Sequence, residues 1–323
     1  MIKLIDFNSA KVDETVYYGG DAGAKEAVVY KGEGWMIKYP KTTRDMKNPQ
    51  ISYTTSPLSE FLGSKIYETL GISVHETLLG IRKNKVVAAC KDFARKSDTV
   101  PVFGNHAFLI AKQLIPFHDL KNSFMASDVD SYSGTGSETL LDEVLATIVG
   151  HEKLKSIPGV LERFWDMFVV DAFIGNNDRN NGNWGILFHP GNKEFTLAPV
   201  YDNGNAFFNK RSLVQMSKRI NDEKAMQEDA YQTQLCAYKY TGLDNEGHKI
   251  NPFKYIKSGD NADCNAAVLR FINTVDMNMI EKMINNIPEE SGNLAVMPQI
   301  QKEFYKELMR IRLDVIRNPS CNL

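Results

Sequence analysis

The stretch GNNDRNNGNWGILFHPGNKEFTLAPVYDNG, residues 175–204, decides the fold that the sequence predicts. It begins with a polar, glycine-containing loop that follows a strongly apolar helical segment, FWDMFVVDAFIG. Two short apolar runs, WGILFH and EFTLAPV, then flank HPGN, a sequence typical of a hairpin turn. Because the second strand returns along the first, we expect Asp202, after the hairpin, to lie near Asn183, before it. Asp178 lies in the same loop, so three oxygen-bearing side chains converge at one end of the hairpin.

These three side chains indicate a magnesium site. Magnesium prefers hard oxygen ligands and is usually held by one or two carboxylates together with substrate phosphates. In protein kinases a catalytic-loop Asp accepts the substrate hydroxyl proton, an Asn five residues later binds metal, and an Asp after a hairpin also binds metal. Asp178, Asn183 and Asp202 follow that order, which favours a phosphoryl-transfer site.

The same loop has two other possible interpretations. Clusters of Asn, Asp and Gly commonly form plain turns, because their side chains bond to the nearby backbone. A calcium-binding EF-hand loop is not matched, since the twelfth position counted from Asp178 is His189 instead of Glu. Because a hairpin and then YDNG follow the loop, the sequence favours a phosphoryl-transfer site over a plain turn.

The predicted fold class is α+β, with two unequal lobes. Residues 1–94 are expected to form a small, strand-rich N-lobe, and residues 95–323 a larger, mostly helical C-lobe. The run AVVYKGEGWMIKYP predicts two strands around a turn at Lys31–Gly34, and NKVVAACKDFA predicts another strand. The run SPLSEFLGSKIYETLGI predicts a helix with Ser56 as its N-cap and Gly71 as its stop. A cleft between two such lobes is a common place for a ligand.

Several residues of the N-lobe are suited to a phosphate. Gly19, Gly20 and Gly23 precede a strand, and their backbone N–H groups can approach phosphate oxygens, although a simple hairpin turn is equally consistent. Lys38 lies on the opposite strand face to its apolar neighbours. Glu60, the first acidic residue of the predicted helix, is its expected ion-pair partner. The alternative is a lysine that points to water.

The segment CKDF lies where the chain passes between the lobes. The backbone N–H and C=O groups of Cys90–Asp92 are candidates to meet an adenine edge, and Phe93 to cover the ring. A core phenylalanine at a strand end is the alternative.

Two further segments carry predictions about structure. Residues 120–137 are polar and rich in Gly and Ser, which predicts a mobile loop. Residues 297–315 carry an apolar stripe at helical spacing, which indicates a helix that packs into the protein's own core rather than a docking surface. The stripe is formed by Met297, Ile300, Phe304, Leu308, Ile311 and Val315.

Composition limits the class of protein. The chain has 323 residues, 43% of them hydrophobic, and a net charge of −2, so no nucleic-acid or membrane partner is expected. Its four cysteines lack CxxC spacing, which is typical of a reducing compartment. The longest apolar stretch is interrupted by Asp166 and Asp171, and the N-terminus has no signal-peptide core. A soluble cytoplasmic protein is therefore expected.

Six segments together are similar to a known family: GGDAGAKEAVV, WMIKYP, SEFLGSKIYETLGI, CKDF, GNNDRNNGN and PVYDNG. The chain resembles the HipA-like serine/threonine protein kinases, and within them the secreted, cell-translocating kinases. The resemblance spans roughly residues 17–205. It implies a bilobal protein-kinase-like fold, ATP and Mg²⁺ as cofactors, a protein substrate, self-phosphorylation and delivery into host cells.

The resemblance also implies site roles. Asp178 matches the catalytic base, and Asn183 and Asp202 match the metal ligands. The family's loop usually reads D-x-H-x-x-N, but Asn180 takes the place of the histidine here. Tyr17 and Tyr18 stand near the place of a regulatory serine, so self-inhibition through serine does not transfer. The nucleotide-binding positions are Gly19, Gly20, Gly23, Lys25, Lys38, Glu60, Asp92, Phe93 and Tyr201.

Three functions remain open from the sequence. The first is an active kinase, and the second is a nucleotide-binding, pseudokinase-like module without turnover. The third is an interaction protein that uses its C-terminal helices. The extra N-terminal subdomain of the longer HipA toxins is not among the matching segments, so their antitoxin partnership and DNA association are not implied. The sequence leaves the oligomeric state and the substrate protein undetermined.

Overall fold

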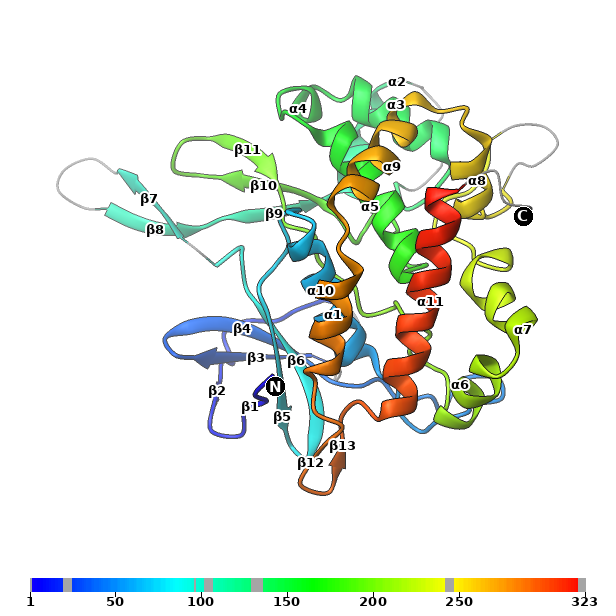
Figure 1. The fold of residues 1–323 in the computed structure, drawn as a ribbon. Helices are drawn as coiled ribbons and strands as arrows, with labels where there is room; N and C mark the ends of the chain where they lie inside the picture. Colours follow the sequence, from blue (N-terminus) through cyan, green and yellow to red (C-terminus); the bar gives the residue numbers. More distant parts are fainter. Residues whose placement is uncertain are drawn as a thin grey trace.

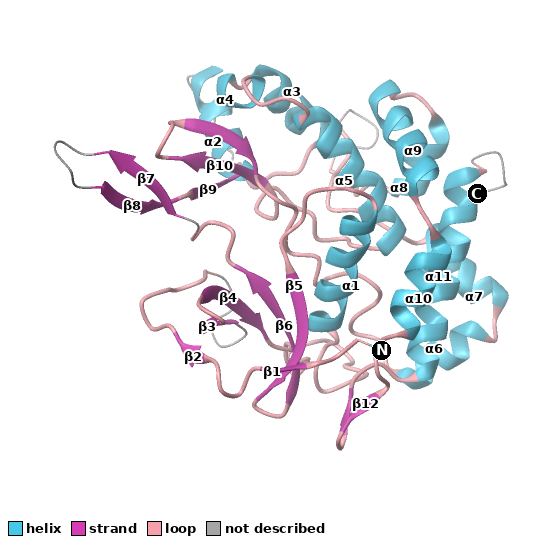
Figure 2. Ribbon diagram, turned by 60° about the vertical axis from the view of Figure 1, so that its left-hand side comes forward, coloured by secondary structure: helices cyan, strands magenta, loops and turns pink. Residues whose placement is uncertain are grey.

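The computed structural model describes residues 2–19, 25–95, 97–101, 107–128, 136–241 and 247–318. Among these, the side chains of 97–101, 107–110 and 127–128 are not described. The predicted α+β class is confirmed: strands gather in the N-terminal part, and helices form most of the remainder (Figures 1 and 2). None of the helices in the described ranges is long and apolar enough to cross a membrane.

The N-terminal part is built on a six-stranded sheet with the order β1-β5-β6-β4-β3-β2. The β1·β5 pair is parallel and the other neighbours are antiparallel. The predicted hairpin is present, but its turn is shorter than expected, because Lys31 and Gly32 take positive φ and the return strand begins at Glu33. The strands are β1 Ile5–Asp6, β2 Lys11–Val12, β3 Lys25–Tyr30, β4 Glu33–Lys38, β5 Thr77–Arg82 and β6 Lys85–Lys91.

Helix α1, Ser56–Thr69, packs against β5 and β6. The helix predicted from the sequence is confirmed, but Thr55 occupies the N-cap position and Ser56 is the first helical residue. Gly71 follows the helix with a φ of +72°, a conformation that a residue with a Cβ adopts only at a cost. The helix is buried on most of its faces because the sheet covers one side and the helical part covers the other. Its acidic residue Glu60 is therefore buried as well.

The prediction of a loop over residues 120–137 is wrong for its first half. Helix α2, Phe117–Asp128, covers that half, and residues 129–135 lie outside the described residues. The polar composition suggested a loop, but Leu120 and Lys121 are buried. The Lys121 ammonium lies 2.6 Å from a carboxylate oxygen of Glu143, so tertiary packing and a partly buried ion pair overcome the weak local preference for helix.

The hairpin that follows the polar loop is confirmed. Strands β10, Gly185–His189, and β11, Glu194–Leu197, pair antiparallel with Ile186 opposite Leu197. Strand β9, Gln113–Pro116, adds a third strand on the other side of β10. The other strand pairs are β7 Ser97–Pro101 with β8 Ala107–Ala111, and β12 Glu290–Ser291 with β13 Leu294–Ala295.

The helical part surrounds α5, whose side chains are mostly buried. The apolar stripe predicted for residues 297–315 lies on α11, where Phe304 and Leu308 are fully buried in the large core cluster. This helix is thus part of the core, as expected. The remaining helices are α3 Leu141–Gly150, α4 Glu152–Lys155, α5 Val160–Ile174, α6 Leu213–Ile220, α7 Glu223–Gln227, η1 Glu228–Gln232, α8 Pro252–Ser258, α9 Ala262–Thr274, α10 Met277–Asn285 and α11 Gln299–Arg317.

Candidate active site

The polar loop after α5 is held by its own side chains. Gly175 ends the helix with a φ of +70°. The Asn176 amide oxygen accepts a hydrogen bond from the backbone N–H of Asp178 (3.2 Å), and the Asn183 amide donates to the Asp178 carbonyl (2.7 Å). The plain-turn interpretation is therefore partly correct for the backbone. The same bonds place the Asp178 carboxylate at the surface of a cleft, where it is exposed.

Arg179 joins this loop to the segment after the hairpin, and the sequence reasoning missed it. One nitrogen of its guanidinium, Nη1, donates to the backbone carbonyls of both Asn183 (2.8 Å) and Tyr201. Its side chain is 2% exposed and lies 2.8 Å from the Asp171 carboxylate on α5. Burial alone would lower the pKa of Arg179, but the neighbouring Asp171 carboxylate outweighs it and raises the pKa. Arg179 therefore holds the backbone of Asn183 close to the residue that precedes Asp202.

Lys38 lies between two carboxylates. Its ammonium is 2.8 Å from Glu60 on α1 and 2.8 Å from Asp202. The expected Lys38–Glu60 ion pair is therefore present, and the water-facing alternative is excluded because the Lys38 side chain is 12% exposed. Asp202 takes a φ of +61°, and its side chain remains 37% exposed. Asp202 is also one of the residues that line the cleft at which Asp178 lies.

The electrostatics of this triad favour the charged forms. Burial would lower the pKa of Lys38, but the carboxylates of Asp202 and Glu60 outweigh it and raise the pKa. Burial would raise the pKa of Glu60, but Lys38 and His75 hold that pKa well below its usual value. The pKa of Asp202 is lowered chiefly by Lys38. All three groups therefore remain ionised near neutral pH.

The cleft that contains these groups has a volume of about 380 Å³. It brings together Asp178 from the C-terminal part and Lys38 and Glu60 from the N-terminal part. Asn183 is not one of its lining residues. The lining is formed by Lys25, Lys38, Tyr39, Lys41, Met46, Thr54, Ser56, Glu60, Asp178, Asp202, Gly204, Asn205, Asn209 and Lys210.

The glycine turn before β3 is described only in part. Gly20 and Gly23 lie outside the described residues, and Gly19 is exposed with open space around it. The Lys25 ammonium donates to the Gly19 carbonyl at 3.0 Å, and Lys25 is the cross-strand partner of Lys38. Burial and the charge of Lys38 lower the pKa of Lys25. These contacts place a second cation at the same end of the cleft.

The crossing segment differs from the expectation. The backbone N–H of Lys91 donates to the Glu76 carbonyl (2.9 Å), and that of Asp92 donates to the Gly34 carbonyl (3.0 Å). These donors are therefore not available to an adenine edge. The Asp92 carboxylate instead accepts from the Tyr18 hydroxyl (2.6 Å) and caps the following turn. The Phe93 and Tyr201 rings are 5.9 Å apart, so these two aromatic residues do meet.

The sequence of this chain matches a known protein family. The profile described as the HipA-like C-terminal domain matches residues 19–275. The chain belongs to this family. The match includes the triad, the polar loop and the hairpin.

A curated HipA-like relative is the serine/threonine-protein kinase CtkA of Helicobacter pylori strain J99. It is 33% identical over 313 residues, which cover 97% of this chain and 86% of the relative. A crystal structure of the proinflammatory kinase CtkA of H. pylori superposes with a TM-score of 0.80 at 30% identity, covering 99% of this chain and all of that chain. The comparisons therefore support an enzyme of the serine/threonine protein kinase class.

A more distant HipA structure agrees with the fold. HipA of the Shewanella oneidensis MR-1 toxin–antitoxin system, solved with HipB and operator DNA, has a TM-score of 0.53 at 12% identity. The superposition covers 99% of this chain and 76% of that chain. At this identity the match concerns the fold alone.

This HipA-like chain departs from the family's loop pattern at Asn180. Its side-chain amide donates to the Asp178 carboxylate at 3.0 Å, and its amide oxygen accepts from the Gly182 backbone at 2.9 Å. An asparagine cannot carry a proton as an imidazole can. At this position the chain therefore orients the Asp178 carboxylate by a neutral hydrogen bond.

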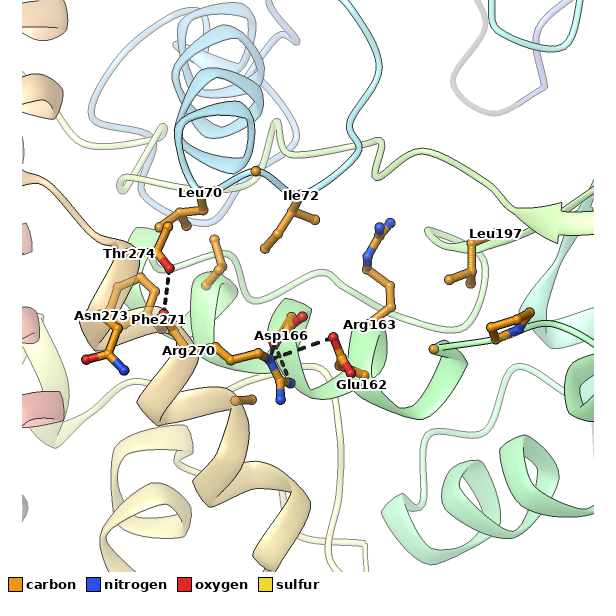
Figure 3. Close-up of a pocket in the computed structure, with 15 residues that line it drawn as sticks. Leu70, Ile72, Glu162, Arg163, Asp166, Leu197, Arg270, Phe271, Asn273 and Thr274 are labelled. Atoms are coloured by element: carbon orange, nitrogen blue, oxygen red, sulfur yellow. Dashed lines mark hydrogen bonds and ion pairs between the residues drawn. The ribbon is translucent and has the colours of Figure 1, made fainter.

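A larger cavity of about 530 Å³ lies away from these groups, where the end of α1 meets α5 and α9 (Figure 3). None of the predicted site residues that the structure describes lines it. Arg270 is 2.7 Å from Asp166 and 3.9 Å from Glu162. With Arg163, which also lines the cavity, the positive and negative charges of the lining balance. The smaller cleft, which has converging charges, is the better candidate for chemistry.

The buried position of Glu60 predicts a dependence of stability on pH. Its folded-state pKa lies below the usual value of 4.5, so its stabilising contribution is present above that value and is lost as the pH falls below it. We expect Glu60→Gln to lower stability at pH 7 by roughly 2 kcal/mol, and to lose less stability than the wild type on going to about pH 3.5. Thermal unfolding at both pH values measures this.

The matched control for that experiment is Glu68→Gln, on the same helix. The Glu68 side chain is 61% exposed and pairs with Lys65 at the surface, so its replacement should leave the pH dependence unchanged. Equal pH dependence in Glu60→Gln and the wild type would contradict the assignment.

Proposed function

We propose that this chain is an ATP-dependent protein kinase that transfers the γ-phosphate of Mg·ATP to serine or threonine hydroxyls of a protein, and that it phosphorylates itself. The observation that carries the proposal is the arrangement of Asp178, Lys38 and Asp202 around one cleft. Phosphoryl transfer depends mainly on positioning and on neutralising charge. The relationship to a serine/threonine kinase supports the hydroxyl class.

We propose a catalytic role for one carboxylate and metal-binding roles for two other side chains. Asp178 is exposed at the cleft and would accept the proton of the attacking hydroxyl. Asp202 and Asn183 would hold Mg²⁺, since their side-chain oxygens are the hard donors that this ion prefers. When bound, ATP would supply the phosphoryl group and Mg²⁺ would neutralise the charge of its phosphates.

The remaining residues are proposed to hold the nucleotide. Lys38 would contact the phosphates while Glu60 fixes its position, and Lys25 adds charge beside it. Gly19, Gly20 and Gly23 are proposed to approach the phosphates, and Phe93 and Tyr201 to form the adenine side. The proposed lobes are residues 1–94 for nucleotide binding and 95–323 for catalysis.

Nucleotide binding can be tested separately from turnover. We expect ATP to raise the thermal midpoint of the wild type only when Mg²⁺ is present, and Asp202→Asn to lose that magnesium dependence. The control is Asp260→Asn, at an exposed aspartate outside the cleft, and this variant should keep the magnesium-dependent thermal shift. No response to Mg·ATP in the wild type would contradict the proposal.

Turnover requires a second measurement. The wild type with γ-labelled ATP and Mg²⁺ should transfer label to itself and to a generic protein substrate, and mass spectrometry should place the label on Ser or Thr. A magnesium-dependent thermal shift without transfer would instead favour the pseudokinase-like alternative. Export from the producing cell is a further proposal that follows from the resemblance, and detection in the culture medium but not in a secretion-deficient strain tests it.

A further inference from the structure

Three buried side chains meet beside the Lys38 triad: Glu60 from α1, His75 from the segment before β5, and Cys90 from β6. Their potential ligand atoms all lie within 4.8 Å of one another. The exposed fractions of these residues are 0%, 3% and 1%. Burying a carboxylate, an imidazole and a thiol together is costly unless each group has a partner.

The partners of Glu60 and His75 are incomplete. One carboxylate oxygen, Oε2, binds Lys38 at 2.8 Å. The other, Oε1, lies 2.9 Å from the His75 Nε2 but accepts no well-directed hydrogen bond among the described residues. The same Nε2 is also 3.1 Å from the Ser64 hydroxyl. The imidazole nitrogen is shared between these two neighbours, so Oε1 has one poorly directed contact and keeps spare acceptor capacity.

A second unpaired group lies next to the thiol. Thr77 is the cross-strand partner of Cys90 in the β5·β6 pair, so both side chains point to the same face of the sheet. Its hydroxyl is buried and has no hydrogen-bond partner among the described residues. Sulfur and oxygen atoms with unused bonding capacity thus converge beside the imidazole.

We propose that Glu60, His75 and Cys90 form a binding site for one Zn²⁺ ion, with a hydroxyl or a water as the fourth ligand. Zinc binds thiolate, imidazole and carboxylate at about 2.0–2.3 Å in a tetrahedron, which separates the ligand atoms by roughly 3.3–3.8 Å. The observed separations reach that arrangement through small side-chain shifts. The thiol proton is released to solvent when the sulfur binds the metal.

The charges of the interior are consistent with a divalent cation. Lys25 and Lys38 against Glu60 and Asp202 leave no net charge beside the cluster. A Cys90 thiolate would add one negative charge next to the metal, which partly offsets the charge of Zn²⁺. The Glu60 oxygen that binds Lys38 is not the one that faces His75, so the ion pair can persist when the metal is bound.

This site differs in chemistry from the proposed magnesium site. Magnesium prefers oxygen ligands and avoids thiolates, whereas zinc accepts sulfur and nitrogen. The two ions would therefore occupy different places in the same cleft region. Glu60 also lines the cleft, which places the cluster next to it. The inference does not depend on phosphate transfer, because metal binding is measured without nucleotide.

The test uses the full chain and cobalt as a spectroscopic substitute for zinc. We expect Co²⁺ to give a thiolate-to-cobalt charge-transfer band in the near ultraviolet, which Zn²⁺ removes by displacement. Cys90→Ser should abolish the band and lower Zn²⁺ affinity by at least about 100-fold. Replacing a residue that only hydrogen-bonds to a metal ligand already costs about 10–100-fold in affinity. The control Cys264→Ser removes another buried cysteine and should keep the band.

Two results would overturn the proposal. One is the absence of the band in the wild type, and the other is its persistence in Cys90→Ser. If Cys90→Ser does not fold, X-ray absorption of the zinc-loaded wild type decides instead. One sulfur ligand per zinc supports the site, and a shell of oxygen and nitrogen alone rejects it.

Discussion

Asp178→Asn is expected to reduce the rate of phosphate transfer by a factor of about 10²–10⁴, because a positioned general base contributes about that much. The substitution keeps the shape of the side chain but removes its ability to accept a proton. Since Asp178 is exposed, the free energy of unfolding should change by less than about 0.5 kcal/mol. Initial rates at saturating Mg·ATP, together with thermal unfolding, measure both effects.

The same experiment separates a catalytic role from a binding role. The loss should appear in kcat with little change in the KM for ATP, because Asp178 acts on the hydroxyl and not on the nucleotide. Asp260→Asn is the control for a lost surface carboxylate and should transfer phosphate at the wild-type rate. Transfer by Asp178→Asn at the wild-type rate would show that another group accepts the proton.

Arg179→Ala is expected to destabilise the protein by about 3–5 kcal/mol. The substitution removes one partner of a buried ion pair and leaves the Asp171 carboxylate, 4% exposed, without its main partner. It also frees the backbone carbonyls of Asn183 and Tyr201, which the guanidinium holds together. Chemical denaturation measures the loss of stability, and a weaker magnesium-dependent response to ATP should accompany it.

A surface arginine provides the matched control. Arg310 is 49% exposed and lies 2.7 Å from Glu281, and its replacement by alanine should cost no more than about 1 kcal/mol. The double variant Arg179→Met/Asp171→Asn should recover part of the stability, because it leaves no unpaired buried charge. A cost below about 1 kcal/mol for Arg179→Ala would contradict a structural role for this arginine.

The candidate site was predicted to different extents in its different parts. The hairpin between Trp184 and Val200 follows from alternating apolar runs around a turn, which is a local signal. The Lys38–Glu60 pair was also predicted, although the strand pattern alone left a water-facing lysine open. Arg179 was missed because its partners come from three separate segments, and a single arginine in a polar loop has no distinguishing pattern.

The errors have a common physical origin. Helix α2 was predicted as a loop because its composition is polar, but Leu120 packs into the core and the buried Lys121 pairs with Glu143. The backbone of Lys91 and Asp92 was expected to be free for adenine, but carbonyls of neighbouring segments take its N–H groups. Each error concerns a contact between residues that are distant in sequence.

The sequence by itself determined the α+β class, helix α1, the hairpin after the polar loop, and the family, because periodicity, turns and short motifs are properties of neighbouring residues. Only the tertiary structure decided which charges meet. It placed Lys38 between Glu60 and Asp202, two residues that are far apart in the sequence. It also brought His75 and Cys90 to the same buried carboxylate. The physical reason is that ion pairs and metal sites depend on distance and burial in space, and chain position alone fixes neither.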